Sequence, residues 1–364
     1  MAYDIYTACA IQPEVWVAHK RDEIKKNLNR CLELIDVAPQ AAFTAKGSYE
    51  AESWAPLKLI TFPEFFIQGH EGTWNFEHYM KEVVIEIPGE ETERLSRKAK
   101  EHDIFISGCA LEYDPTWKDY IFNTQFVIDP KGEIVHKYRK FTTATHYELS
   151  VSPHDVLDRY VERYGNHLEA FFPVTETDIG KIGTLTCMDS HFPETARALG
   201  VNGAEVIIKP HYVDPMMTPP LEIWQAGNKM RAYENICYVI APARGLLLGA
   251  MRPKCFVPGK SMIVNYNGAV LAYADFPGET MITGVINLEE LRRRRTDPSR
   301  NFLSLLRNEI YRKIYEKSMY PPNQFLEESP KTRAARDPRE VLRKLFDEGI
   351  FKKPNSLPTY LRED

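Results

Sequence analysis

The chain lacks the short signatures that mark nucleotide, dinucleotide, zinc-protease and serine-hydrolase chemistry. No GxxxxGK[ST], GxGxxG, HExxH or GxSxG string occurs in its 364 residues, although such strings are what phosphate cradles, zinc sites and nucleophile elbows are built on. The ten histidines and six cysteines are dispersed without the spacing of metal ligands. The sequence therefore predicts chemistry that needs neither a metal nor another cofactor.

Long apolar runs and secretory features are missing as well. No stretch approaches the roughly 20 apolar residues that span a bilayer, and the start MAYDIYTACAIQ has no basic and apolar leader regions. The cysteines form no CxxC pair, which is typical of reduced thiols rather than disulfides. We expect a cytoplasmic protein with no membrane partner.

An excess of positive charge is also absent. The formal net charge is −5, whereas a nucleic-acid binder gains most of its affinity by neutralising phosphates. The one basic run, Arg292 to Arg295, is interpreted as a solvated helix face or a subunit contact, because no aromatic residues surround it as in a nucleic-acid platform. No nucleic-acid partner is expected.

What is present is the composition of a globular protein, with 43% hydrophobic, 12% aromatic and 27% charged residues. Strand patterns alternate with helical ones, as in KIGTLTC, PETARALG and AEVIIKP, which predicts a layered α/β fold. Turn chemistry around 129–132 and 267–268 predicts two hairpins, so the sheets are expected to be mixed. The polar stretch 41–56 reads as a surface insertion.

A change in composition near residue 296 divides the chain. Residues 1–295 carry the strand and helix alternation and are predicted to form one catalytic domain. Residues 296–364 are rich in Pro, Arg and Glu, with two short helical patterns. We interpret them as a C-terminal extension that packs on the domain or on a partner subunit.

Cys187 stands out within the stretch TLTCMDSHFPE. It ends an apolar strand and precedes a Pro-Glu that starts a helix, so a strand-to-helix turn is expected to present its side chain. The Met188 N–H at such a turn has no secondary-structure partner and suits an oxyanion hole. The competing interpretation is a buried structural thiol, because free cysteine is among the most buried residue types.

Two charged residues at other strand ends favour the catalytic interpretation. Glu64 ends the apolar segment LITFPE, and Lys140 follows the strand GEIVHKYR. Lys140 is expected to lower the pKa of the Cys187 thiol and to stabilise an oxyanion. Glu64, with a pKa raised by burial, is expected to take the thiol proton and return it to the leaving group.

The strings LITFPEFF, KYRK and TCMDSHFPE, followed by RAYEN and VPGKSMIVNYNG, resemble those of the nitrilase superfamily of carbon–nitrogen hydrolases over about residues 5–295. The resemblance implies a four-layer αββα sandwich and a triad that maps onto Glu64, Lys140 and Cys187. It also implies association into a homodimer or higher homo-oligomer through helices flanking the site.

Members of the superfamily carry a second glutamate between the lysine and the cysteine. The resemblance favours Glu162, which precedes a Gly and a Phe-Pro-Val as in family members. Glu148, eight residues after Lys140, is the alternative. Either residue would orient the lysine or the attacking water, and the interpretation without function is a solvated loop residue.

The residues after the cysteine bear on the substrate. Met188-Asp189 and Pro193-Glu194 resemble amidase-like and carbamoyl-cleaving members rather than nitrile-hydrolysing ones. The resemblance therefore implies an amidohydrolase that cleaves a small linear amide through a cysteine thioester and releases ammonia or an amine. The alternative is an N-carbamoyl amidohydrolase, which also releases carbon dioxide. A nitrilase and an inactive scaffold of the same fold are less favoured.

Carbamoylases of this kind often place an arginine just after the Cys-x-Asp to hold a substrate carboxylate. Ser190 and His191 occupy that position here, which disfavours an anionic substrate. A small-molecule substrate is expected to contact residues of the cysteine turn and of the segment KPHYVDPMM, namely Met188, His191, His211 and Tyr212, with Met216 and Met217 as a flexible wall.

Overall fold

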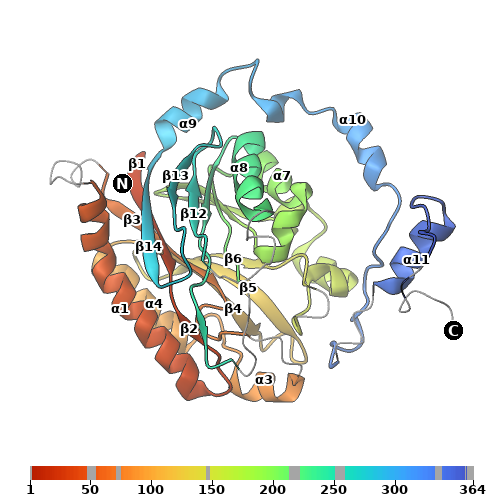
Figure 1. Ribbon diagram of the computed structural model, residues 1–364, viewed down its shortest axis with the longest axis horizontal. Coiled ribbons are helices and arrows are strands. Elements are labelled where there is room, and N and C mark those ends of the chain that lie inside the picture. Colours follow the sequence, from red (N-terminus) through yellow and green to blue (C-terminus); the bar gives the residue numbers. More distant parts are fainter. Residues whose placement is uncertain are drawn as a thin grey trace.

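Two six-stranded sheets pack face to face, and helices cover both outer faces (Figure 1). The computed structural model describes residues 2–46, 55–70, 75–144, 148–212, 222–250, 259–332, 338–356 and 358. The expected four-layer αββα fold is therefore confirmed. Met216 and Met217 lie outside the described residues.

The first sheet has the strand order β14-β1-β3-β4-β5-β6. Strands β1, β3 and β4 run parallel, while β14, β5 and β6 pair antiparallel with their neighbours. Burial on both faces explains their near-continuous apolar sequences. The strands are β1 (Ile5–Gln12), β3 (Leu57–Glu64), β4 (Phe105–Tyr113), β5 (Ile121–Ile128), β6 (Ile134–Arg139) and β14 (Thr280–Asn287).

The second sheet has the order β13-β12-β10-β9-β8-β7, with β8, β9 and β10 parallel. Its strands are β7 (Val174–Thr177), β8 (Gly180–Thr184), β9 (Val206–Ile208), β10 (Tyr238–Ala241), β12 (Met262–Val264) and β13 (Val270–Tyr273). A separate ribbon pairs β2 (Val15–Trp16) with β11 (Leu247–Leu248).

Both predicted hairpins form. β5 pairs antiparallel with β6 across the turn at 129–132, and β12 pairs antiparallel with β13 across Asn267-Gly268. Gly268 adopts a φ of 78°, a left-handed conformation that a residue without Cβ takes without strain. The sheets are mixed, as expected.

Helices form the two outer layers. α1 (Arg21–Lys46) and α4 (Glu90–His102) pack on the first sheet, and α7 (Pro193–Val201) and α8 (Ile223–Asn235) pack on the second. The remaining helices of the domain are α3 (Phe76–Glu82), η1 (Pro153–Val156), α5 (Leu157–Tyr164), α6 (Leu168–Phe171), η2 (Cys187–His191) and α9 (Leu288–Arg295). Three apolar layers result, one under each pair of helices and one between the sheets.

The basic run lies on α9, and part of it binds the domain. Arg292 pairs with Glu205 at 2.7 Å, and Arg295 donates to the carbonyl of Ile236 at 3.0 Å. These contacts fasten α9 to the second sheet. Within the described residues, no helix is long and apolar enough to cross a bilayer.

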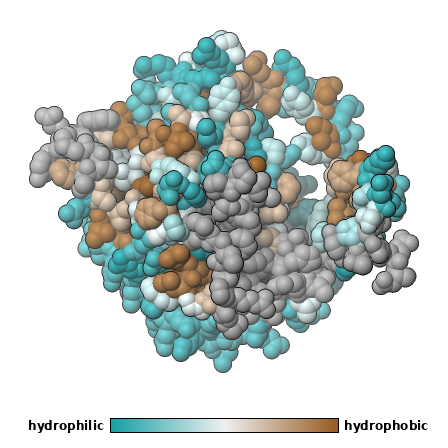
Figure 2. All heavy atoms as spheres, viewed as in Figure 1, coloured by the Kyte–Doolittle hydropathy of each residue, from teal (hydrophilic) through white to brown (hydrophobic). Residues whose placement is uncertain are grey.

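The chain beyond α9 forms an arm around the side of the domain (Figure 1). Its helices are η4 (Phe302–Leu305), α10 (Asn308–Tyr311), η5 (Arg312–Tyr315) and α11 (Arg339–Asp347). The Phe325 side chain is buried against Trp117 and Tyr160, and the Tyr120 hydroxyl donates to the Phe325 carbonyl at 2.8 Å. Figure 2 shows an opening between the arm and the body, so the arm touches the domain at only some points.

Candidate active site

Three strand ends bring Glu64, Lys140 and Cys187 together. Glu64 is the last residue of β3, Lys140 follows β6, and Cys187 begins η2 just after β8. Glu64 and Lys140 are 1% and 0% exposed, and the Lys140 Nζ lies 2.8 Å from Glu64 Oε1. The Cys187 thiol lies close enough to Glu64 for the carboxylate to raise the pKa of the thiol. A buried carboxylate and ammonium beside a half-buried thiol suit nucleophilic catalysis.

The turn at Cys187 is sharp. Cys187 has a φ of 48°, an uncommon value for a residue with a side chain. Its N–H donates to the Pro210 carbonyl at 2.9 Å, which fixes the turn against the segment after β9. Among the hydrogen bonds of the described residues, none uses the Met188 N–H. That N–H remains a donor for a substrate oxygen beside the sulfur.

Asp189 connects the cysteine turn to the loop after Lys140. Its carboxylate accepts from the Thr186 N–H at 3.0 Å, from the Thr142 N–H at 2.6 Å and from the Tyr138 hydroxyl at 2.7 Å. Burial raises the pKa of Asp189 to about 6, against the opposing effects of the Lys140 charge and of these donors. One side chain therefore holds the cysteine turn and the loop after Lys140 in register.

The structure places Glu148 beside the lysine, and the preferred candidate Glu162 lies elsewhere. Glu148 is 2% exposed and forms an ion pair with the Lys140 ammonium. Glu162 lies on α5 with its side chain exposed to solvent, and the ion pairs of Lys140 are with Glu64 and Glu148. The Glu148 N–H donates to the Ala144 carbonyl at 3.0 Å.

Asn123 on β5 is a further member of the cluster that sequence reasoning missed. Its side-chain amide donates to Glu64 Oε1 at 2.7 Å and to Glu148 Oε2 at 3.3 Å. The available signal was the polar run Asn123, Thr124 and Gln125 inside a strand that is otherwise apolar. A buried polar side chain needs a partner, so such a run indicates a polar interior site.

Burial and neighbouring charges shift the pKa values of the cluster in opposite directions. Burial raises the pKa of Glu64 above its usual value of 4.5, although Lys140 acts in the other direction. Burial would also raise the pKa of Glu148, but the Lys140 charge and donors from Lys140, Asn123 and Ala144 outweigh it and hold that pKa low. The same burial would lower the pKa of Lys140, yet the two glutamates keep it well above 10.5.

The pKa of the Cys187 thiol is also set by opposing effects. Burial, together with the negative charge of Glu64 and Glu148, raises the pKa of Cys187 well above 9, and Lys140 offsets only part of this. Lys140 lowers the pKa of the thiol as expected, but burial and the carboxylates outweigh this effect. Burial and the two carboxylates therefore favour the protonated thiol over the thiolate.

Cavities lie on two sides of the cysteine turn. A cavity of about 770 Å³ is lined mainly by apolar side chains, among them Met188, Phe141 and Phe172, and by Tyr315 and Tyr320 of the arm. A smaller cavity of about 240 Å³ is lined by residues that include His191, Lys209, Trp224 and Arg231. The expected substrate-binding residues Met188 and His191 thus line different cavities.

The other two expected substrate-binding residues are buried. His211 is 1% exposed and packs on Trp224, with 4.2 Å between ring centroids. Tyr212 is 2% exposed, packs on Phe65 at 5.3 Å, and lies under the Arg244 guanidinium at 4.5 Å. Both follow Pro210, whose carbonyl holds the Cys187 N–H, so this segment borders the cysteine turn.

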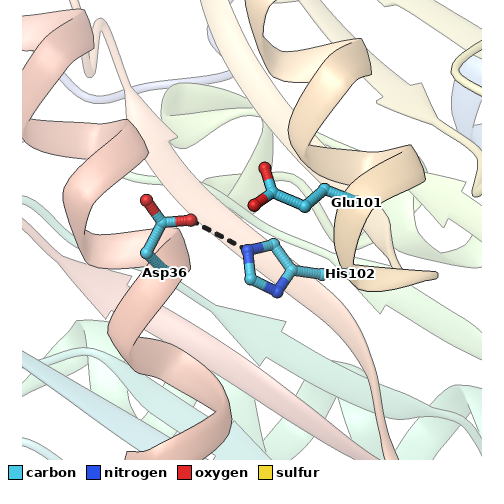
Figure 3. A group of neighbouring side chains, drawn as sticks. All are labelled: Asp36, Glu101 and His102. Carbon is cyan, nitrogen blue, oxygen red and sulfur yellow. Dashed lines mark hydrogen bonds and ion pairs between the residues drawn. The ribbon is translucent and has the colours of Figure 1, made fainter.

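One group of potential metal ligands lies away from the strand ends. Asp36 of α1 and Glu101 and His102 of α4 place one ligand atom each within 4.8 Å of one another (Figure 3). The Lys98 ammonium also lies 2.6 Å from Asp36 and 2.8 Å from Glu101. This cation, with His102, already pairs the carboxylates, so the group is explained as an ion-pair network joining two helices.

Comparison with known proteins agrees with this geometry. The carbon-nitrogen hydrolase family model matches residues 7–296. The formamidase of Bacillus cereus (strain Q1) is 26% identical over 268 residues, covering 73% of this chain and 69% of the relative. A carbon-nitrogen hydrolase from Helicobacter pylori G27 has a similar structure, with a TM-score of 0.65 and 20% identity, covering 86% of this chain and 99% of that one.

A third similar structure is a mutant of the amidase from Nesterenkonia sp. AN1, with a TM-score of 0.60 and 17% identity, covering 85% of this chain and 96% of that one. That structure shows covalent addition of the acetamide moiety of fluoroacetamide at the active-site cysteine of the amidase. The resemblance to the nitrilase superfamily is confirmed. The chain belongs to the carbon-nitrogen hydrolase family.

Proposed function

We propose that this carbon–nitrogen hydrolase cleaves a small linear amide through a thioester on Cys187, releasing ammonia or an amine. The observation that carries the proposal is the buried contact of Glu64 with the Lys140 ammonium, beside the Cys187 thiol whose pKa both groups shift. The amide-cleaving relatives support the substrate class.

In the first half of the reaction, Glu64 takes the thiol proton while the sulfur bonds to the amide carbon. Negative charge then develops on the amide oxygen, where the Lys140 ammonium and the Met188 N–H stabilise it. Glu64 passes its proton to the amide nitrogen, and the carbon–nitrogen bond breaks. The products are a thioester and a neutral amine or ammonia.

In the second half, water replaces the departed amine. Glu64 takes a proton from the water as its oxygen bonds to the thioester carbon, and the same donors stabilise the second oxyanion. The carbon–sulfur bond then breaks, the acid leaves, and the proton returns to sulfur. Glu148 acts by holding Lys140 charged and in place, since it shares the ammonium with Glu64.

An ammonia-release screen of the purified protein tests the proposal. Formamide, acetamide, propionamide, N-carbamoyl amino acids and matching nitriles are compared at equal concentration. We expect the amides to give the highest kcat/KM, and a mass increase of the acyl group on Cys187 in acid-quenched samples. Turnover without a Cys187 adduct, or no turnover of any amide, contradicts the proposal.

The small cavity favours a second candidate function, an N-carbamoyl amidohydrolase. His191, Lys209 and Arg231 line this cavity, and the Arg231 guanidinium donates to the Ser190 carbonyl at 3.4 Å beside the cysteine turn. In this second candidate function, the basic side chains of the cavity bind the carboxylate of the substrate, a contact for which the position after Cys-x-Asp offers no arginine. Release of carbon dioxide together with ammonia distinguishes this function from amide cleavage.

We also propose that the protein self-associates into a homodimer or a larger homo-oligomer. Large apolar side chains are exposed on α7, α8 and the arm, among them Val201, Met230, Tyr233, Ile310 and Ile314, and Figure 2 shows apolar surface along the arm. Exposed apolar patches of this kind mark association surfaces. Light scattering coupled to size exclusion tests this, with an Ile310→Asp, Ile314→Asp variant expected to dissociate; a wild-type mass of 42.0 kDa contradicts it.

A further inference from the structure

We infer that Asn123 is a positioning residue that decides which oxygen of Glu64 accepts the thiol proton and that keeps Glu64 ionised. This inference rests on the proposed function, because it concerns the base of the same reaction. The central feature is one buried amide group that donates to two carboxylates on either side of one ammonium.

The backbone places Asn123 at the centre of the cluster. It lies on β5, between β4 and β6, and is fully buried. Its carbonyl accepts from the Lys140 N–H at 2.8 Å, so the residue also fixes the point where the chain leaves β6 for the catalytic lysine. Asn123 therefore contacts both glutamates through its side chain and the lysine through its backbone.

The orientation of the amide follows from its neighbours. The buried Cys109 thiol lies 3.2 Å from Asn123 Oδ1 and donates to it. The two amide hydrogens then face Glu64 and Glu148, which accept as carboxylates. The reverse orientation would place the amide oxygen against two negatively charged acceptors, and it would leave the NH₂ group facing the thiol.

The two oxygens of Glu64 consequently have different surroundings. Oε1 accepts from Asn123 Nδ2 at 2.7 Å and from Lys140 Nζ at 2.8 Å. Two charge-stabilising donors on one oxygen leave the other, Oε2, for the Cys187 thiol. Proton transfer from sulfur thus goes to Oε2, and Asn123 keeps the carboxylate from rotating away from that geometry.

The same donors act on the charge of Glu64. Two buried carboxylates share one ammonium, so the cluster carries an excess negative charge that burial penalises. Each donated hydrogen bond favours the ionised form of a carboxyl group. Without the Asn123 amide, we expect Glu64 to bind a proton first, because burial already raises its pKa whereas that of Glu148 is held low. A protonated Glu64 cannot act as the base.

The test uses the full-length protein with Asn123→Leu, which has a similar size and no donor, and Asn123→Asp, which keeps the shape and adds a carboxyl group. The rate of Cys187 alkylation by iodoacetamide is measured by mass spectrometry from pH 4 to pH 10. In the wild type the rate rises with pH as Glu64 loses its proton. In Asn123→Leu we expect this rise of the alkylation rate to begin about one pH unit higher, and in Asn123→Asp we expect a shift at least as large. At a pH between the rise of the wild type and that of the variant, alkylation of the variant should be about tenfold slower.

Thr124→Val is the matched control. Thr124 lies on the same strand and is equally buried, but its hydroxyl donates to Glu112, which belongs to another ion-pair group. We expect the control to be less stable, while its alkylation rate rises at the same pH as in the wild type. The inference is overturned if the alkylation rate rises at the wild-type pH in both folded Asn123 variants. It is also overturned if the control shifts by the same amount. If one Asn123 variant does not fold, the other variant decides the test.

Alkylation of Cys187 requires no amide turnover, so the role of Asn123 and the proposed amidase function can be tested independently. A shifted limb in a protein that hydrolyses no amide supports the role of Asn123 and removes the proposed function. An unshifted limb in an enzyme that does cleave amides removes only the inference. Steady-state ammonia release from the preferred amide shows whether the Asn123 variants change kcat or KM. We expect a lower kcat, because Asn123 contacts the base rather than the substrate.

Discussion

Lys140 and Glu148 form an ion pair in which both side chains are almost completely buried, at 0% and 2% exposure. Removing one partner from such a pair leaves an uncompensated charge, which is far more costly than the loss of a surface ion pair. Because the same ammonium also contacts Glu64, the position of the base depends on Glu148 as well.

Glu148→Gln is therefore expected to reduce kcat by about 10²-fold or more, since the amide holds Lys140 less firmly and no longer balances its charge. Glu162→Gln is the matched comparison, because Glu162 is exposed on α5 and makes no ion pair with Lys140. The measurement is steady-state ammonia release, with thermal melting as the check on folding. A larger loss in Glu162→Gln than in Glu148→Gln would reverse the assignment.

Cys187→Ala is expected to lower amide hydrolysis by about 10⁴-fold or more while the melting temperature stays close to that of the wild type. The side chain is partly exposed at the start of η2, so its loss leaves only a small void. Cys31→Ala serves as the control, because Cys31 is buried between α1 and the first sheet and contacts no catalytic group. The control should lose stability and keep its activity.

Activity is expected to fall as the pH is lowered. In the proposed mechanism Glu64 acts in its ionised form. Burial raises its pKa above 4.5, so kcat/KM is expected to rise with pH through that raised value and to be lost below it. The pKa of Lys140 is held well above 10.5, so loss of its proton does not limit the rate at moderately alkaline pH. A pH profile of kcat/KM checks this, and Glu64→Gln should abolish the acidic limb together with the activity.

Much of the site could be predicted because each triad residue stands at the end of an apolar strand. A charged residue such as Glu64 or Lys140 at the end of a buried segment has a desolvation cost, which makes it conspicuous in the sequence. The three strand ends lie in two sheets, β3 and β6 in the first and β8 in the second, so their convergence was implied by the family resemblance and not by the order of strands in one sheet. The alternation of strands and helices predicted a layered α/β fold, and the family resemblance implied the four-layer arrangement.

The remaining features depend on geometry that the sequence does not encode locally. Glu148 lies in an irregular loop where no periodicity shows which way a side chain points, so its spacing from Lys140 could not rank it above Glu162. The pKa of Cys187 depends on the combined effect of burial, two carboxylates and one ammonium, and the degree of burial cannot be read from the sequence.

The first helix shows the same limit for local structure. The polar stretch 41–56 was expected to form a surface insertion, but α1 continues to Lys46. Ala38 and Ala42 are fully buried on the helix face that packs on the first sheet. Small apolar residues at i and i+4 extended the buried stripe, and this tertiary contact outweighed the Pro39 between them.

Asp189→Asn is expected to lower kcat by about 10²-fold with little change in KM. The amide NH₂ group that replaces one oxygen cannot accept from the Thr142 N–H or from the Thr186 N–H, so one of the two catalytic segments loses its anchor. Slower alkylation of Cys187 by iodoacetamide reports the misplacement directly. Unchanged alkylation together with unchanged kcat would show that the two segments hold their register without this carboxylate.

Phe325→Ala tests how the C-terminal arm is held. The Phe325 side chain is 6% exposed in a cluster of aromatic and aliphatic residues on the domain, and removing a buried phenyl group typically costs about 3 kcal/mol. Since the arm touches the domain at only some points, we expect this loss to release the arm rather than unfold the sheets. Limited proteolysis should then cleave between 296 and 332 faster than in the wild type, while Ile310→Ala, at an exposed position on α10, should leave the cleavage rate unchanged. Equal protection of both variants would mean that a partner subunit, and not the Phe325 contact, holds the arm.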